Sequence, residues 1–172
     1  MDVKQAIEDR RSIRKYQDRP VPQELIDEVL NAARLAPSGN NTQPWRYKVI
    51  TDDETKRELQ DAGLIRDQFV YKAPVIIVCC ADPTSYKKHV EGWDDDNKSR
   101  AARDLNIASS YITLQATALG LGTCYCGWIK EEGLKVALGI PEHLIVPYVI
   151  TLGYPDEDPK ARPRKDLVDI LL

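Results

Sequence analysis

The sequence is poor in the residue patterns that hold metals or build disulfide frameworks. It has two histidines, His89 and His143, and its four cysteines stand at 79–80, Cys124 and Cys126. Zinc ligands usually come as Cys-x2-Cys-like pairs, often with histidines, so no metal site is expected. The cysteine spacing also matches a disulfide framework poorly, which indicates a reduced, cytoplasmic protein.

Long apolar runs and a strong net charge are absent too. The run at 74–81 is far too short to span a bilayer, and the N-terminus MDVKQAIEDR has no apolar segment typical of a signal peptide, so no membrane association is expected. Lys and Arg number 24 against 27 Asp and Glu, a net charge of −3. This balance gives no uniform positive field and argues against a nucleic-acid partner, although a local basic pocket stays possible.

The chain of 172 residues has the length of one domain, which we expect to span 1–172 without repeats or a linker. Apolar periodicity predicts helices and strands mixed along the chain. The expected helices are 3–9, 22–36, 51–63, 100–119 and 130–138, and the expected strands are 45–51, 74–81, a short one after Gly120, and 144–152. The polar segment 82–99, with the acidic run 94–96, is expected to be a solvent-exposed insertion.

Two further expectations concern which apolar side chains are buried and what buries them. The helix at 100–119 carries two adjacent apolar stripes, one through Ile107 and Tyr111 and one through Ala108 and Ile112, which predicts burial over much of its circumference. The C-terminal arm 154–172 is polar but ends in apolar residues, which indicates that its tip docks on another subunit.

Two basic clusters stand near opposite ends of the chain. One is Arg10-Arg11-Ser12-Ile13-Arg14, and the other is Arg162-Pro163-Arg164-Lys165. Guanidinium groups bind phosphate in a fork geometry with charge assistance, and a serine hydroxyl adds a donor. The clusters could converge on one dianionic phosphate, whereas the simpler alternative for the first is a solvated basic turn.

Two loops offer further polar groups. The segment 37–45 supplies a serine hydroxyl, three side-chain amides and Trp45, which suit the edge of a heteroaromatic ring, although it could equally be a capped surface loop. The segment 120–128, GLGTCYCGW, has glycines that would let a ligand approach the backbone. It matches neither the dinucleotide-binding fingerprint nor the phosphate loop of nucleotide hydrolases.

Together these segments resemble the FMN-dependent nitroreductase family. The motifs that carry the resemblance are RRSIRKY, APSGNNTQPW, GLGTCYCGW and LGYPDEDPKARPRKDL, and they cover nearly the whole chain in order. The resemblance implies an α+β fold with a mainly antiparallel central sheet flanked by helices. It also implies an intertwined homodimer with FMN at the subunit interface and with the arm 154–172 docked on the partner.

The resemblance assigns roles to individual residues. Arg10, Ser12 and Arg14 would hold the FMN phosphate, with Arg11 along the ribityl chain, and Arg162 and Arg164 would complete the phosphate site. Ser38, Gly39 and Asn41 would reach the flavin from the partner subunit. Backbone groups of Cys126 and Gly127 would face the reactive edge of the flavin. Relatives also use a polar residue ahead of the central strand, and spacing does not choose between Arg66 and Gln68 for that role.

The implied reaction is electron transfer from NADH or NADPH through the flavin to a small electron-poor aromatic acceptor, such as a nitroaromatic or a quinone. The flavin carries this chemistry, so no side chain is expected to act as a catalytic base. Alternatives are a specialised flavin enzyme of the same fold (dehalogenation, flavin fragmentation or dehydrogenation), a non-catalytic flavin-binding module, and a phosphoanion-binding protein without flavin. Cys124 and Cys126 could form a redox pair, but packing in the core is the preferred interpretation.

Overall fold

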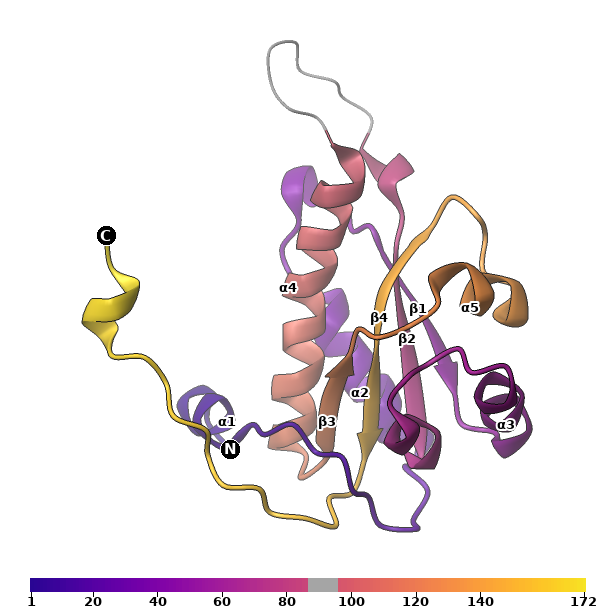
Figure 1. The fold of residues 1–172 in the computed structure, drawn as a ribbon. Coiled ribbons are helices and arrows are strands. Elements are labelled where there is room, and N and C mark those ends of the chain that lie inside the picture. Colours follow the sequence, from indigo (N-terminus) through magenta and orange to yellow (C-terminus); the bar gives the residue numbers. More distant parts are fainter. Residues whose placement is uncertain (87–95) are drawn as a thin grey trace.

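The structure, a computed structural model, describes residues 1–86 and 96–172 and has three layers, with a sheet between two sets of helices (Figure 1). Half of the insertion expected at 82–99 therefore lies outside the described residues, as does His89. The sheet order is β1-β2-β4-β3, and all of its neighbouring strands are antiparallel. The expected α+β class with an antiparallel sheet is confirmed. The element bounds are α1 Val3–Asp9, α2 Gln23–Arg34, β1 Trp45–Ile50, α3 Asp53–Asp61, β2 Val75–Ala81, α4 Asn97–Ala118, β3 Gly122–Cys126, α5 Glu131–Leu138 and β4 Ile145–Gly153.

Helices cover both faces of the sheet. On one face α4 and α2 pack over side chains such as Ile77 and Ile150, and on the other α3 and α5 cover Ile76 and Val149. All residues of β2 are buried as a result, which explains why its sequence is continuously apolar. The strand lies at the centre of the fold.

The long helix α4 differs from the expectation drawn from its two apolar stripes. Ala108 and Ile112 are fully buried against the sheet, whereas Ile107 and Tyr111 are 40% and 39% exposed. An apolar stripe shows which side chains avoid water but not whether they meet their own core or another chain. Among the described residues this stripe stays partly exposed, with α1 lying beside it near Tyr111.

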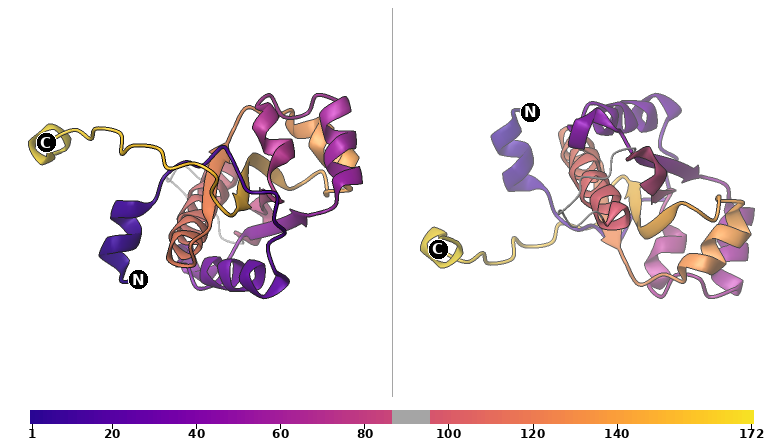
Figure 2. Two further views of the ribbon diagram at one scale, coloured as in Figure 1. Left: turned by 90° about the horizontal axis from the view of Figure 1, so that it is seen from below. Right: turned by 90° about the horizontal axis from the view of Figure 1, so that it is seen from above.

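The C-terminal arm leaves the body of the molecule (Figures 1 and 2). Beyond Lys160 every side chain is exposed, including the apolar tip with its short 3-10 helix Leu167–Ile170. No apolar surface of the described residues covers the tip. No helix of the described chain is long and apolar enough to cross a membrane.

Candidate functional site

A small cavity joins the two basic clusters. Its lining contains six cationic side chains and Ser12, and no carboxylate of the described residues. The residues around this space of about 100 Å³ are Arg10, Arg11, Ser12, Arg14, Pro159, Lys160, Arg162 and Arg164. Segments almost 150 positions apart in the sequence thus present their charge to one point.

Backbone pairing explains how the clusters meet. Ser12 forms a bridge with Thr123 of β3, and the Ile13 amide donates to the Thr123 carbonyl at 2.9 Å. The same N-terminal segment then pairs with the start of the arm: the Asp156 amide donates to the Lys15 carbonyl at 3.0 Å. A carboxylate fixes this junction, since Glu157 accepts from the amides of Arg14 and Lys15.

The arginines of the cavity have no ionic partner among the residues that the structure describes. None of Arg10, Arg11, Arg14, Arg162 and Arg164 belongs to an ion pair between described residues. Three of these guanidinium groups donate to nearby backbone carbonyls only, as in the bond from Arg164 to the Arg162 carbonyl at 3.0 Å. Concentrated positive charge without a counterion costs free energy through self-repulsion, so the cavity is suited to a multiply charged anion.

Gly122 allows the first basic cluster to lie against β3. A Cβ atom at this position would stand 2.6 Å and 2.8 Å from two carbons of Ile13. The glycine therefore opens space for Ile13 of the same chain, not for a ligand as the loop composition suggested. The packing of Ile13, itself only 6% exposed, positions the arginines on either side of it.

The loop at 38–43 is held in a strained shape at a different place. The backbone φ angles of Asn40, Asn41 and Gln43 are 53°, 55° and 49°. Residues other than glycine rarely adopt this region. The Asp104 carboxylate of α4 accepts from the Gly39 amide at 2.8 Å, and the Ser38 hydroxyl accepts from the Gln43 amide at 2.9 Å. These hydrogen bonds hold the loop in its strained conformation, in which its polar groups are exposed.

One chain does not bring this loop to the basic cavity. The loop contacts α4 at Asp104, whereas the cavity adjoins β3, which begins after α4 ends at Ala118. At 1.5 Å per residue these places are about 20 Å apart along the helix axis. Figure 1 shows the loop near one end of α4 and the start of β3 near the other.

Cys126 and Gly127 lie at the end of β3. Cys124 and Cys126 are free thiols, 4% and 2% exposed, and both belong to the core cluster beneath α3 and α5. The Cys126 thiol donates to the Cys124 carbonyl at 3.7 Å. The closeness of the two thiols lowers the pKa of Cys124, with further help from Arg14 and Ser12, and raises the pKa of Cys126. The side chains fill the core, while Gly127 is exposed.

The two residues between which spacing could not choose lie beside this strand end. The Arg66 guanidinium carbon stands 4.9 Å from the centre of the Trp128 ring. The Gln68 side chain is engaged elsewhere, because its Oε1 accepts from Gln60 at 3.0 Å. Of the two, Arg66 presents its charged group to the ring of Trp128, the residue after Gly127.

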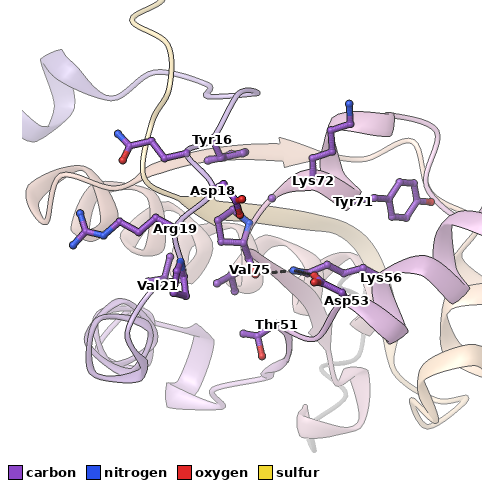
Figure 3. Close-up of a pocket in the computed structure, with 14 residues that line it drawn as sticks. Tyr16, Asp18, Arg19, Val21, Thr51, Asp53, Lys56, Tyr71, Lys72 and Val75 are labelled. Carbon is purple, nitrogen blue, oxygen red and sulfur yellow. Dashed lines mark hydrogen bonds and ion pairs between the residues drawn. The ribbon is translucent and has the colours of Figure 1, made fainter.

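A separate cavity of about 430 Å³ lies between the segments 16–21 and 71–75 (Figure 3). Its lining mixes Arg19, Lys72 and Lys56 with Asp18 and Asp53 and includes none of the site residues predicted from the sequence. The Lys56 ammonium is satisfied within the fold, by the Pro74 carbonyl at 3.0 Å and by Asp53 at 3.3 Å. Among the residues that the structure describes, no cluster of His, Cys, Asp and Glu could hold a metal ion.

Comparison with known proteins identifies the family. The family model described as "Nitroreductase family" matches residues 7–65 and 60–154, most of the chain. A protein of Methanothermobacter thermautotrophicus named as an NADH dehydrogenase/NAD(P)H nitroreductase is 40% identical over 98% of this chain and 84% of its own length. The chain belongs to the nitroreductase family.

Two further family members are similar over nearly the whole chain. The NADH dehydrogenase of Thermus thermophilus is 33% identical over 100% of this chain and 96% of its own. A nitroreductase structure from Desulfovibrio desulfuricans, solved in complex with FMN, is 30% identical, with a TM-score of 0.86, and covers 100% of this chain and 96% of that one. The nitroreductase fold expected from the motifs is confirmed.

Three residues of this nitroreductase-family chain were not singled out from the sequence. Asp104 accepts a hydrogen bond from the strained loop, and Glu157 joins the first basic cluster to the arm. The ring of Trp128 contacts the Arg66 guanidinium. Asp104 and Glu157 act through contacts with residues more than sixty positions away, which local pattern does not encode. Trp128 did offer a signal, since it directly follows the glycine of the GLGTCYCGW motif.

Proposed function

We propose that this protein is an FMN-dependent oxidoreductase that passes electrons from NADH or NADPH to an electron-poor aromatic acceptor such as a nitroaromatic or a quinone. The observation that carries the proposal is the cavity lined by six cationic side chains and no carboxylate of the described residues. Its place in the chain is where the family motifs would put the FMN phosphate. The FMN complex of the Desulfovibrio relative and the names of the other two relatives support the same cofactor and donors.

The cationic residues of the cavity repel one another, whereas a phosphate dianion would attract all of them. Arg10, Arg14 and Ser12 would hold the phosphate, Arg11 would lie along the ribityl chain, and the pair Arg162 and Arg164 would close the site from the arm. Each charge-assisted hydrogen bond contributes roughly 1.5–3 kcal/mol. Riboflavin lacks the phosphate, so these arginines would favour FMN over riboflavin.

At the end of β3 the chain would position the ring system. When bound, FMN supplies the hydride and electron transfer chemistry, and the protein supplies binding, orientation and electrostatics. The exposed Gly127 leaves the backbone there open to the reactive edge, while the thiols of Cys124 and Cys126 stay in the core. This arrangement uses no side chain as a proton-abstracting base. The four free cysteines fit a cytoplasmic place of action.

The proposal includes a homodimer in which each site uses two chains. A two-fold interface is self-complementary, so two α4 helices packed antiparallel through the stripe at Ile107 and Tyr111 would place opposite helix ends side by side. The Asp104 end of one chain would then adjoin the basic cavity of the other. Ser38, Gly39 and Asn41 could reach the partner's flavin in this way, across the distance of about 20 Å that separates them from their own cavity.

The test begins with an absorption spectrum of the purified protein, which should show bound flavin, and with NADH and NADPH oxidation on adding menadione. Arg14→Ala should then weaken FMN binding tenfold to a hundredfold and leave riboflavin binding nearly unchanged. Lys4→Ala, at an exposed cation of α1 outside the cavity, is the matched control. A colourless protein that does not bind FMN, or equal losses for FMN and riboflavin, would contradict the proposal.

A further inference from the structure

An exposed aromatic ring stands beside the proposed flavin site. Trp128 comes directly after Gly127, and 68% of the residue is exposed, the largest fraction of any aromatic residue that the structure describes. Single apolar residues on a surface are common and need no explanation by themselves. Two less exposed rings, Tyr154 and Tyr86, also have an arginine over them, but Trp128 combines such a cation with a largely exposed ring.

Backbone pairing fixes that cation in place. The Arg66 amide donates to the Trp128 carbonyl at 2.9 Å, and the Lys130 amide donates to the Leu64 carbonyl at 2.8 Å. Ile65 and Ile129 form an antiparallel bridge between these two bonds. The two segments therefore hold the Arg66 guanidinium 4.9 Å from the centre of the indole, within the range of a cation–π contact.

The guanidinium keeps its hydrogen-bonding capacity. Within the described chain Arg66 belongs to no ion pair, and its hydrogen bonds are made by its backbone amide and carbonyl. Its side-chain donors thus stay available on the face of an exposed ring. A planar guanidinium matches carboxylate and phosphate oxygens in a fork, and an indole offers a stacking surface for a flat ligand.

We propose that Arg66 and Trp128 form a recognition platform for the anionic group of a substrate at the flavin, which gives the enzyme a preference for acidic substrates. The inference rests on the proposed function, because it takes Gly127 to mark the reactive edge. The anionic group can belong to the acceptor, as a carboxylate on an aromatic ring, or to the phosphates of the nicotinamide dinucleotide. Both present oxygens that a guanidinium recognises in the same way.

Two acceptors of nearly the same shape test the platform in the FMN-loaded enzyme. Arg66→Gln should raise the KM for 4-nitrobenzoate roughly tenfold, the lower end of what a hydrogen bond to a charged group contributes, and leave the KM for neutral 4-nitrobenzamide within about twofold. Arg66→Lys keeps the charge but loses the fork, and should restore part of the effect. Trp128→Leu should raise the KM for both acceptors, since either ring can stack on the indole.

A second arm distinguishes the source of the anion. With 4-nitrobenzamide as acceptor, a raised KM for NADH and NADPH in Arg66→Gln would assign the platform to the dinucleotide phosphates and still support it. Arg57→Gln, at an exposed arginine of α3, is the control for loss of surface charge.

Two outcomes separate the platform from the function on which it rests. If the wild-type protein reduces 4-nitrobenzamide but Arg66→Gln alters the KM of no anionic substrate, the platform is wrong and the proposed function stands. If the wild-type protein neither binds FMN nor reduces any acceptor, the function fails and the platform fails with it.

Discussion

Replacing Gly122 by alanine should weaken FMN binding through packing alone, without removing any group that touches the ligand. The new methyl group would lie 2.6 Å and 2.8 Å from carbons of Ile13, whereas favourable carbon contacts lie near 3.5–4.0 Å. Ile13 must therefore retreat from β3 by roughly 1 Å, and its neighbours Ser12 and Arg14 move with it. Overpacking of this kind costs about 1–3 kcal/mol of stability.

The expected result is a rise of roughly tenfold to a hundredfold in the FMN dissociation constant, as one or two charge-assisted bonds are lost. Fluorescence titration with FMN and with riboflavin measures it, and riboflavin should respond less. Gly133→Ala is the matched control, because its methyl group would also stand 2.6 Å from a side-chain carbon, of Leu64, but in α5. A Gly122→Ala protein with wild-type FMN affinity would refute the idea that packing of Ile13 positions the arginines.

Three further results are expected. Asp104→Ala leaves the Gly39 amide without its acceptor, so the strained loop should loosen and FMN affinity should fall severalfold in titrations. Asp104→Asn should restore part of the affinity. Unchanged affinity in Asp104→Ala would show that the loop does not contribute to FMN binding. The Cys126 side chain is buried in the core, so Cys126→Ala should lower the free energy of unfolding in urea melts and leave most of the flavin-reduction rate intact in stopped-flow traces. Loss of most turnover in that variant would contradict a packing role and favour a redox pair with Cys124. Truncation after Asp166 should shift the protein toward monomer by light scattering, and a truncated protein that stays fully dimeric would show that the tip is not at the interface.

The sequence predicted the elements well where one physical signal dominated. The run at 74–81 is β2, buried on both faces, and the residues beyond Gly120 form β3. The two basic clusters do lie on one cavity, as the chemistry of a shared phosphate suggested. Chain pairing that no local pattern encodes, from Lys15 to Asp156, brings them together.

Other features depend on which surface an apolar or small residue meets. The periodicity of α4 is correct as a pattern, but it cannot tell a stripe that faces the core from one that faces a second chain, and Ile107 stays exposed. Gly122 is needed for close approach, as its type suggests, but the approaching atoms belong to Ile13. In both cases the sequence shows the steric or hydrophobic requirement, and only the folded chain shows its partner.

If each site takes its arginines from one chain and its loop from another, cofactor binding and assembly are one equilibrium. A ligand that binds only the dimer stabilises it by RT ln(1 + [L]/Kd), which is about 2.7 kcal/mol per site when the ligand stands at a hundred times its Kd. That equals roughly one or two fully buried leucine or isoleucine side chains, at 1.5–3 kcal/mol each. The tip at Leu167–Leu172 has five apolar side chains, so truncation removes more stabilisation than saturating FMN supplies, and excess FMN should restore only part of the dimer. FMN that fails to shift the truncated protein toward dimer would mean that one chain completes the site by itself.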